Sequence, residues 1–322
     1  MQAVVYDRYG SSDVLRLVEL DKPVPEDDEV LVRVRAASIN PYDWHFMAGV
    51  PYLMRLQFGL RKPKRGRPGV DLAGEVEAVG ENVTEFRPGD EIFGWWDGAF
   101  AEYVAVSQDQ LALKPRESTF EQAAAVPLAG LTALQLLRDT GQIQRGQKVL
   151  INGASGGVGT CAVQVAKSFG AEVTGVCSTR NVDMVRSIGA DHVIDYTSED
   201  FTLGDRRYDL ILDNVGNRSL TACRRALDSK GIYIASFGRR HRRWLGPLPY
   251  LFRMRALSLF VSQKMVSRTA KPNKEELLRL KELLETGKLS PVIDRRYGLD
   301  EVPEAMRYLE EGHAQGKIVI SV

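Results

Sequence analysis

Cysteine is scarce in this sequence. Among 322 residues there are three, Cys161, Cys177 and Cys223, and none of them forms a CxxC pair. This pattern excludes a disulfide framework and a zinc knuckle. It indicates a reducing compartment, so we expect a cytoplasmic location.

Long apolar runs and a strong net charge are also missing. No stretch approaches the roughly 18 uninterrupted apolar residues of a membrane-spanning helix, and the first residues, MQAVVYDRYG, do not have the pattern of a signal peptide. The formal net charge is +1, so no overall field selects a polyanionic partner. Hydrophobic residues make up 44% and charged residues 26%, which is typical of globular proteins. The length favours two domains.

The first third of the chain has the periodicity of β-structure. Residues Glu29 to Ser38 alternate between valines and charged side chains, and Val70 to Gly80 and Phe100 to Val106 read as further strands. Turn sequences separate them, namely Arg67-Pro68-Gly69 and Arg87-Pro88-Gly89-Asp90. Short strands with regular turns predict a small, barrel-like β domain.

The pattern changes after residue 118. Ser118 and Glu121 have the spacing of a capping box at the start of an apolar helix. From Lys148 onward strands alternate with helices, which predicts a parallel sheet with right-handed crossovers and an overall α/β class. We expect helices to end at Gly170 and Gly189. A charged helix over Lys274 to Glu285 and a last strand, GKIVISV, complete the prediction.

A glycine-rich loop is the most specific local motif. The segment KVLINGASGGVG (148–159) places Ala154, Gly156 and Gly159 at the spacing of the dinucleotide-binding fingerprint. The segment follows a predicted buried strand and begins a helix, which is the context that this motif requires. Gly156 lets the backbone approach a pyrophosphate, and the helix N-terminus supplies amide donors and a partial positive charge.

The end of the next strand indicates which dinucleotide binds. It reads Cys177-Ser-Thr-Arg-Asn181, without the Asp or Glu that binds the ribose 2′-hydroxyl of NAD. Ser178 offers a hydroxyl, and Arg180 offers a guanidinium for the 2′-phosphate of NADP. We therefore expect NADPH, although Arg180 also fits a solvent-facing position at a helix start.

Several motifs together resemble one enzyme family. The segments SINPYDW, PGVDLAGEVEAVGENVTEFRPGDEIFG, NGASGGVGTCAVQVAKSFGAEVTGVCSTRN and GKIVISV occur in the order found in the medium-chain dehydrogenase/reductase superfamily, and they are most similar to its zinc-independent, quinone oxidoreductase-like branch. The resemblance implies a GroES-like β-rich catalytic domain, 1–118 with 288–322 returning to it, and a Rossmann domain with a doubly wound parallel sheet, 119–287. It also implies a homodimer and the reduction of quinones, enones or alkenals by NADPH.

The resemblance further implies a set of site residues. Asn40 and His45 would face the nicotinamide and the substrate, although relatives often carry an aromatic residue in place of His45, and the chain has a long insertion between Gly49 and Gly69. The expected cofactor-binding residues are Thr132 beside the nicotinamide, Ser155, Gly156, Gly157 and Val158 at the phosphates, Ser178, Arg180 and Tyr196 at the 2′-phosphate, and Asn217, Ser236, Phe237 and Gly238 on the nicotinamide side.

No residue set typical of a catalytic zinc site is visible. Cysteine is absent before residue 161, and the remaining candidates, Asp43, His45 and Asp71, make an unusual set; Asp43 equally fits a structural role in the turn after Asn40. Without a Lewis acid, a conjugated acceptor is favoured over a simple alcohol or ketone. Asn40, Tyr42, His45 and a bound water are the candidate donors.

Two basic segments leave other functions open. Residues 61–67 and 239–255 are rich in arginine and lysine, which fits solvated loops, a lid for an anionic substrate, or contact with nucleic acid or an anionic membrane. One alternative to an enone or quinone reductase is therefore an NADPH-binding protein that contacts nucleic acid or a membrane through these segments and has little turnover. An NAD(P)-linked alcohol dehydrogenase with an unusual set of metal ligands is another. Arg255 to Ser262 has strand character, and the resemblance implies that this strand pairs edge to edge across the dimer.

Overall fold

The chain folds into two units. The computed structural model describes residues 1–64, 66–236 and 248–322. The first unit consists of Met1–Leu131, Pro272–Gly287 and Pro291–Val322, and the second of Thr132–Lys271 and Lys288–Ser290. The division falls inside helix α4 (Pro127–Gln135).

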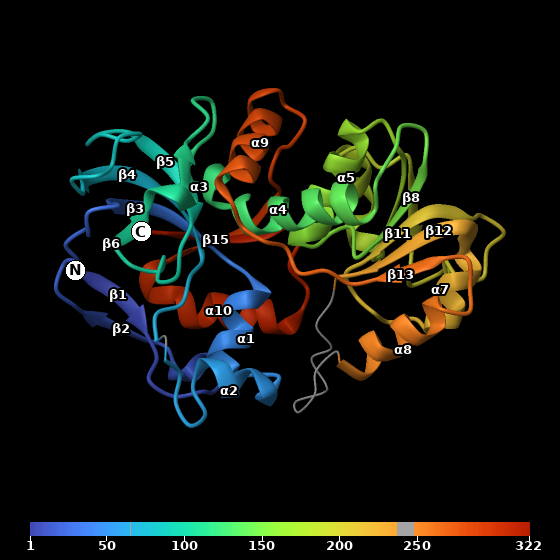
Figure 1. Cartoon of the computed structure of the whole chain (residues 1–322), viewed down its shortest axis with the longest axis horizontal. Helices are drawn as coiled ribbons and strands as arrows, with labels where there is room; N and C mark the ends of the chain where they lie inside the picture. The colour runs from blue at the N-terminus through green and yellow to red at the C-terminus, as the bar shows by residue number, and fades with distance from the viewer. Residues whose placement is uncertain (65, 237–247) are drawn as a thin grey trace. The chain divides into compact units, whose positions relative to one another are not determined.

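A mostly antiparallel sheet, in which only β14 and β15 of the described strands pair in parallel, dominates the first unit (Figure 1). Within the described residues it has seven strands in the order β14-β15-β3-β4-β5-β7, and β6 also pairs with β3. Alternating residues of β3 such as Val30, Val32 and Val34 are buried, as the periodicity predicts. The strands are β3 (Glu29–Ile39), β4 (Asp71–Val79), β5 (Glu91–Trp95), β6 (Tyr103–Ser107), β7 (Leu111–Leu113), β14 (Ile293–Gly298) and β15 (Lys317–Ser321), with a separate pair formed by β1 (Gln2–Val5) and β2 (Arg16–Glu19).

Helices cover this sheet and close its core. The apolar face of α10 buries Val302, Ala305 and Met306 against residues of β3 and β15. The helices of the unit are α1 (Pro41–Ala48), α2 (Arg55–Phe58), α3 (Phe120–Ala124), α9 (Lys274–Glu285) and α10 (Val302–Glu311), with short 3-10 turns at Ser12–Val14, Tyr52–Met54, Gln108–Gln110 and Leu299–Glu301.

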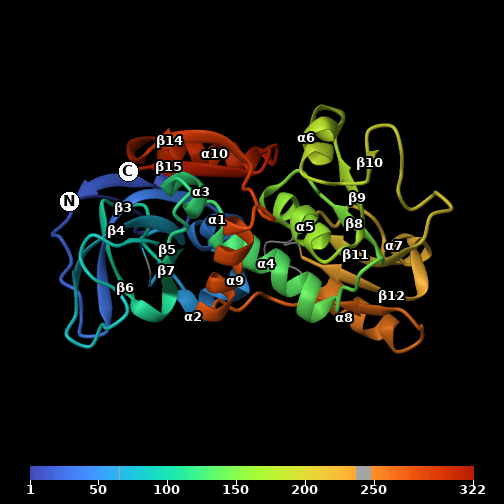
Figure 2. The ribbon, with the colours of Figure 1, turned by 90° about the horizontal axis from the view of Figure 1, so that it is seen from above.

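The second unit is built on a parallel sheet. Its described strands follow the order β10-β9-β8-β11-β12-β13, which is the order of doubly wound dinucleotide-binding sheets. Figures 1 and 2 show α5 on one face of this sheet and α7 and α8 on the other. The elements are β8 (Lys148–Asn152), α5 (Gly157–Ser168), β9 (Glu172–Cys177), α6 (Val182–Ser187), β10 (His192–Asp195), β11 (Tyr208–Asp213), α7 (Leu220–Ala226), β12 (Leu227–Ala235), α8 (Leu248–Ser258) and β13 (Lys264–Val266), with a π-turn at Leu136–Thr140 and a 3-10 turn at Thr179–Asn181.

The α/β class, the β-rich first unit and the parallel second sheet are confirmed. Gly170 and Gly189 follow α5 and α6 with φ angles of 77° and 107°, as expected for residues that end helices in the left-handed conformation. Helix α9 spans the predicted residues.

Two local predictions differ from the structure, and the insertion adds an element on which no prediction was made. The capping box before α3 is formed by Thr119 and Gln122, because Thr119 accepts a hydrogen bond from the Gln122 amide, and not by Ser118 and Glu121. The segment from Arg255 ends helix α8, because Tyr250 and Met254 bury one helical face; β13 is the edge strand instead. The insertion between Gly49 and Gly69 contains α2.

The division into units also differs from the predicted boundaries at 118 and 287. Helix α9 belongs to the first unit, where it buries Leu277 among residues of the β-sheet and Leu280 next to Gly130. The chain up to Leu131 belongs there as well. Of the described helices, none is long and apolar enough to cross a membrane.

Candidate functional site

The glycine loop in the second unit connects β8 to the N-terminus of α5. Gly153 adopts a φ of 80°, and its amide and that of Ala154 both donate to the carbonyl of Val176, at 3.1 and 3.0 Å. These bonds fix the loop against the end of β9. Ser155, Gly156, Gly157 and Val158 therefore lie at the start of a 12-residue helix, where unpaired amides favour an anion.

Two glycines of this loop have different roles. A Cβ on Gly159 would lie 2.0 Å from the carbonyl oxygen of Gly153, so only glycine fits between the loop and the helix. A Cβ on Gly156 would meet no neighbour closer than 3.7 Å, so Gly156 faces open space. The loop is therefore closed toward the protein and open where the fingerprint places the pyrophosphate.

Two predicted residues are joined by a third that sequence analysis missed. The side-chain amide of Asn181 donates to Ser155 Oγ at 3.1 Å and to Ser178 Oγ at 3.2 Å. Its own Oδ1 is buried and has no hydrogen-bond partner among the described residues. The bonds of Asn181 bring the phosphate loop and the end of β9 together.

The remaining 2′-phosphate candidates lie on the surface. Arg180 is exposed, and Tyr196 follows β10 with its amide bonded to the carbonyl of Cys177 at 3.0 Å. The carboxylate of Asp195, at the end of β10, accepts a hydrogen bond from Thr179 Oγ1 at 2.6 Å. That bond and others from Thr197 hold the pKa of Asp195 below its usual range. The adenosine end of the site therefore contains a carboxylate that the sequence analysis did not foresee.

A buried polar cluster occupies the ends of β8 and β11. Asp213 accepts hydrogen bonds from Asn152 Nδ2 at 2.8 Å and from Tyr233 at 2.6 Å, and Asn152 also donates to Asn217 at 3.1 Å. Both polar side-chain atoms of Asn214 are buried without a partner in the part of the chain that the structure describes. Burial of an amide is unfavourable unless a ligand or a water bonds to it.

Of the other residues predicted on the nicotinamide side, the structure describes Ser236 and Thr132. Ser236 directly follows the last residue of β12, and its amide donates to the carbonyl of Asp213 at 2.9 Å. Thr132 lies in α4 as the first residue of the second unit. Phe237 and Gly238 lie outside the described residues, as does the basic segment through residue 247. The open Gly156, the helix N-terminus and the unpartnered amide atoms of Asn181 and Asn214 fit a dinucleotide.

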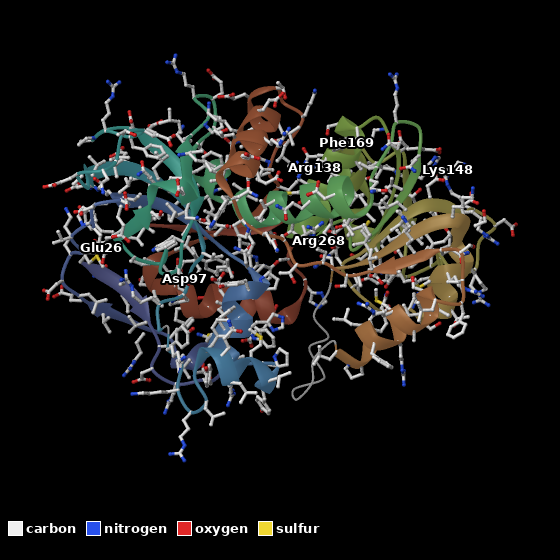
Figure 3. All side chains as sticks on the ribbon, viewed as in Figure 1. Glu26, Asp97, Arg138, Lys148, Phe169 and Arg268 are labelled. Atoms are coloured by element: carbon white, nitrogen blue, oxygen red, sulfur yellow. The ribbon has the colours of Figure 1, made fainter. Side chains whose placement is uncertain are left out.

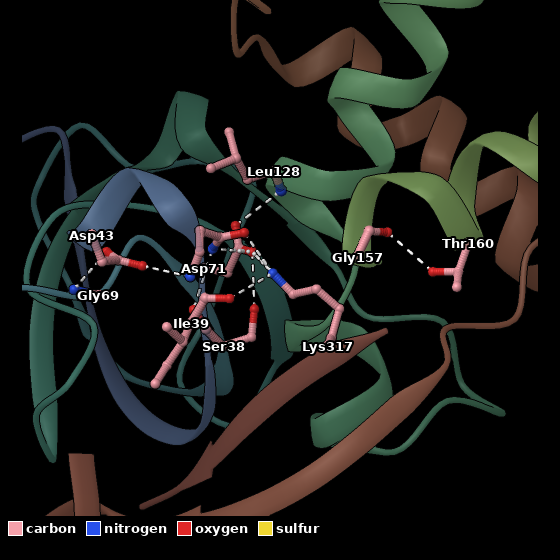
Figure 4. Close-up of polar contacts among 10 residues, drawn as sticks. Ser38, Ile39, Asp43, Gly69, Asp71, Leu128, Gly157, Thr160 and Lys317 are labelled. Atoms are coloured by element: carbon pink, nitrogen blue, oxygen red, sulfur yellow. Dashed lines mark hydrogen bonds and ion pairs between the residues drawn. The ribbon is translucent and has the colours of Figure 1, made fainter. Parts of the chain in front are cut away.

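The first unit contains a buried network centred on Asp71, which is fully buried (Figure 4). Its Oδ2 accepts from Ser38 Oγ at 3.0 Å and Asn40 Nδ2 at 2.9 Å and pairs with Lys317 Nζ at 3.3 Å. Its Oδ1 accepts from the Leu128 amide at 2.9 Å. Lys317, which is 3% exposed, also donates to Asn40 Oδ1 at 2.5 Å. The network joins β3, β4, β15 and the start of α4.

Asp43 holds the start of α1 in place. Its carboxylate accepts from the amides of Asn40 at 2.8 Å and Gly69 at 3.0 Å. This confirms the structural interpretation of Asp43. Burial raises the pKa of the Asp43 carboxyl to about 7, because desolvation outweighs these two hydrogen bonds.

The three candidate donors have different surroundings. Asn40 uses its side-chain amide to donate to Asp71 and to the carbonyl of Ser38, so both of its N–H groups are engaged. This argues against Asn40 as the donor to a substrate and gives it a positioning role. His45 Nδ1 lies 2.8 Å from the carbonyl of Val50. That nitrogen must carry the proton, so Nε2 of the neutral ring is an acceptor.

Tyr42 is the candidate that lies at a pocket. Its ring packs on Phe46, with centroids 4.3 Å apart, and both residues line a small pocket of the first unit together with Arg67. Within the described residues, no group of three or more His, Cys, Asp or Glu side chains is arranged to hold a metal ion.

Two family models match the chain. The model described as alcohol dehydrogenase GroES-like domain matches residues 26–116, and the model described as zinc-binding dehydrogenase matches residues 188–320.

Named relatives are similar over nearly the whole chain. NAD(P)H oxidoreductase RTN4IP1, mitochondrial, of Bos taurus is 35% identical over 100% of this chain and 89% of its own length. The 2-methylene-furan-3-one reductase of Solanum lycopersicum is 35% identical over 99% and 79%. The chloroplastic quinone-oxidoreductase QR1 of Triphysaria versicolor is 33% identical over 99% and 98%.

Solved structures show the same fold. The quinone oxidoreductase of Coxiella burnetii is 32% identical, with a TM-score of 0.87 over 100% of this chain and 99% of its own. The quinone oxidoreductase of Escherichia coli, solved in complex with NADPH, is 26% identical, with a TM-score of 0.85 over 100% of both chains. These relatives agree with the NADPH expected from the sequence.

The cytoplasmic location predicted from the sequence is contradicted by these names. The RTN4IP1 proteins are mitochondrial, and QR1 is chloroplastic. The prediction was wrong because scarce cysteine indicates only a reducing environment, which the interiors of these organelles can share with the cytosol.

The two units, their matching family models and the relatives lead to one assignment. The chain is an oxidoreductase that belongs to the medium-chain dehydrogenase/reductase superfamily, in its quinone oxidoreductase-like branch.

Proposed function

We propose that this chain reduces quinones or α,β-unsaturated carbonyl compounds with NADPH and without zinc. The glycine loop between β8 and α5 carries the proposal, because it is open at Gly156 and lies close in the fold to the buried, unpartnered amide of Asn214. The relatives named as quinone oxidoreductases and as a furanone reductase support the acceptor class. Scarce cysteine supports independence from zinc.

Residues of the second unit would hold the cofactor. Ser155 to Val158 would bind the pyrophosphate, and Ser178, Arg180 and Tyr196 would bind the 2′-phosphate. Asn181 would orient both serines through the bonds that it makes to them. Bound NADPH supplies the hydride to the acceptor.

Residues of the first unit would position the acceptor and stabilise its oxygen. Addition to a conjugated system spreads the developing charge, so a hydrogen bond from Tyr42 suffices where an isolated ketone would require a metal or a strong acid. Asn40 would act as a positioning residue, since its amide is held by Asp71 and Lys317. His45 would donate only as the imidazolium, because its neutral form keeps the proton on Nδ1.

An acceptor panel tests the proposal. Quinones, enones, alkenals, ketones and alcohols would be assayed with NADPH and with NADH, before and after chelation. We expect NADPH to be preferred, conjugated acceptors to be reduced, and chelation to leave the rate unchanged. Oxidation of alcohols with no reduction of any quinone or enone would contradict the reaction class, and a chelator-sensitive rate would contradict the absence of zinc.

Replacement of Tyr42 by Phe tests the donor. It removes the hydroxyl and keeps the ring that packs on Phe46. We expect kcat to fall about 100-fold, as for the loss of a general acid, while the KM for NADPH stays unchanged. His45→Phe is the comparison and should retain most of the turnover. The reverse ranking would assign the donor to His45.

We also propose a homodimer. Strand β13 lies at the edge of the parallel sheet, and the residues before it include Phe252, Leu259 and Phe260, which are 76%, 79% and 85% exposed. An exposed edge strand with apolar neighbours favours pairing with a second copy. Light scattering during gel filtration distinguishes the dimer from the monomer.

A further inference from the structure

Arg67 has hydrogen-bonding groups that nothing in the described protein satisfies. Its Nε and Nη2 atoms are both buried, and neither has a partner among the described residues. These two nitrogens form the side edge of the guanidinium, which binds both oxygens of a carboxylate in parallel. Arg67 as a whole is only partly buried, and desolvation lowers its pKa. Burial of one edge of its cation is unfavourable unless an acceptor bonds to that edge.

The backbone around Arg67 is held on both sides. The carbonyl of Gly66 accepts from the Tyr6 amide at 2.8 Å, and the carbonyl of Pro68 accepts from the Phe100 amide at 3.3 Å. Gly69 is held further by Asp43. Arg67 therefore projects from a fixed segment.

Gly98 leaves the space that the guanidinium needs. A Cβ on Gly98 would lie 3.2 Å from Arg67 Nε, which is tighter than ordinary contact. Position 98 also has a φ of 94°, which favours glycine. The backbone of Gly98 therefore packs directly against the guanidinium.

The guanidinium lines the pocket that Tyr42 also lines. Aromatic side chains, namely Tyr6, Tyr42 and Phe46, form much of its wall. We propose that this pocket binds the carboxylate of a conjugated carbonyl or quinone acceptor, with both carboxylate oxygens on the Nε and Nη2 atoms of Arg67. The proposal rests on the proposed function, and it adds a specificity residue that selects acidic acceptors.

Asp97, labelled in Figure 3, lines the same pocket and opposes an anion there. Its carboxylate does not bond to the Nε or Nη2 atom of Arg67. Removal of this charge by Asp97→Asn should therefore strengthen the binding of an acidic acceptor. If Arg67 served only as a structural partner of Asp97, the same change would not improve binding.

The test compares one acceptor in two charge states. Acetylacrylate, an enone that carries a carboxylate, and its uncharged methyl ester are each assayed with NADPH. We expect Arg67→Gln to raise the KM for acetylacrylate about 10- to 100-fold, from the loss of a bidentate charge-assisted contact, and to leave the ester within about twofold. Arg67→Lys, which keeps the charge but not the planar edge, should be intermediate. Arg61→Gln, an exposed change in the same segment, is the matched control and should change neither acceptor.

Each outcome has a defined meaning. Equal losses for acid and ester in Arg67→Gln, or no loss for the acid, would overturn the inference. If neither acceptor nor any quinone is reduced, the proposed function fails. The inference is then tested alone by titrating acetylacrylate against wild type, Arg67→Gln, Arg67→Lys and Asp97→Asn and following protein fluorescence. Binding that is weakened by the Arg67 changes and strengthened by Asp97→Asn supports the inference, and binding that is insensitive to all three overturns it.

Discussion

Replacement of Lys317 by Met should destabilise the first unit strongly. Lys317 is 3% exposed and its ammonium bonds to Asn40 Oδ1 at 2.5 Å, to the carbonyl of Ile39 at 3.2 Å and to Asp71 at 3.3 Å. Methionine has a similar length and fills the same volume. The change therefore removes the charge and its hydrogen bonds and leaves little cavity.

The size of the stability loss in Lys317→Met follows from the Asp71 carboxylate that remains buried. Asp71 has no exposed surface. Among the described residues, loss of Lys317 leaves its buried charge with hydrogen bonds from Ser38, Asn40 and the Leu128 amide. Breaking a buried ion pair by removing one partner typically costs about 3–5 kcal/mol. At about 2–4 °C per kcal/mol for a unit of this size, the melting temperature should fall by roughly 6–20 °C.

Urea unfolding followed by tryptophan fluorescence measures this loss. Trp44, Trp95 and Trp96 all lie in the first unit. The comparison variants are Asp71→Asn and the double variant Asp71→Asn/Lys317→Met. Because the second change removes the uncompensated charge, the double variant should be more stable than the sum of the single losses predicts, by about 1–3 kcal/mol. Strictly additive losses, or a loss below about 1 kcal/mol for Lys317→Met, would refute the reasoning.

Two further predictions concern protonation and the glycine loop. Since burial raises the pKa of Asp43 to about 7, the folded chain retains a proton there that the unfolded chain releases near pH ~4. The free energy of unfolding of the first unit should therefore fall as pH rises from about 4 to about 7, and Asp43→Asn should remove that part of the slope in urea titrations; an unchanged slope would contradict the shift. Gly159→Ala should unfold or distort the loop, whereas Gly156→Ala should keep the melting temperature and weaken NADPH binding in a fluorescence titration. Equal melting temperatures for the two variants would contradict the assigned roles.

Sequence patterns correctly predicted the helices, strands and turns that are determined by residues close together in the chain. The alternation in β3, the helix ends at Gly170 and Gly189, and the glycine loop are set by residues close in sequence. The segment after Arg255 was misassigned because alternating apolar residues are ambiguous over a short range. Tyr250 and Met254 are four residues apart and both are buried. This spacing is the signal that distinguishes a helix from a strand in this segment.

The candidate site was predicted only where one segment forms it. Ser155 and Ser178 were candidates from their motifs, and their cofactor contacts stay predictions. Asn181 was not a candidate, because its bonds to both hydroxyls depend on a turn that brings its amide back to them. Lys317 was predicted only as part of a strand. Its partners Asn40 and Asp71 are 277 and 246 residues away in the chain, and no local pattern can show that its ammonium is buried between them.

The buried carboxylates of Asp43 and Asp71 differ from the guanidinium of Arg67 in their hydrogen bonding. In Asp43 and in Asp71, each carboxylate oxygen accepts at least one hydrogen bond from a described group. Gly69, whose amide bonds to Asp43, lies two residues from Arg67, so the packing here is tight enough to satisfy buried polar atoms. Loose packing therefore does not account for the two unpartnered nitrogens of Arg67. A ligand that supplies both acceptors at once would account for them, since Arg67 lines the pocket that Tyr42 also lines.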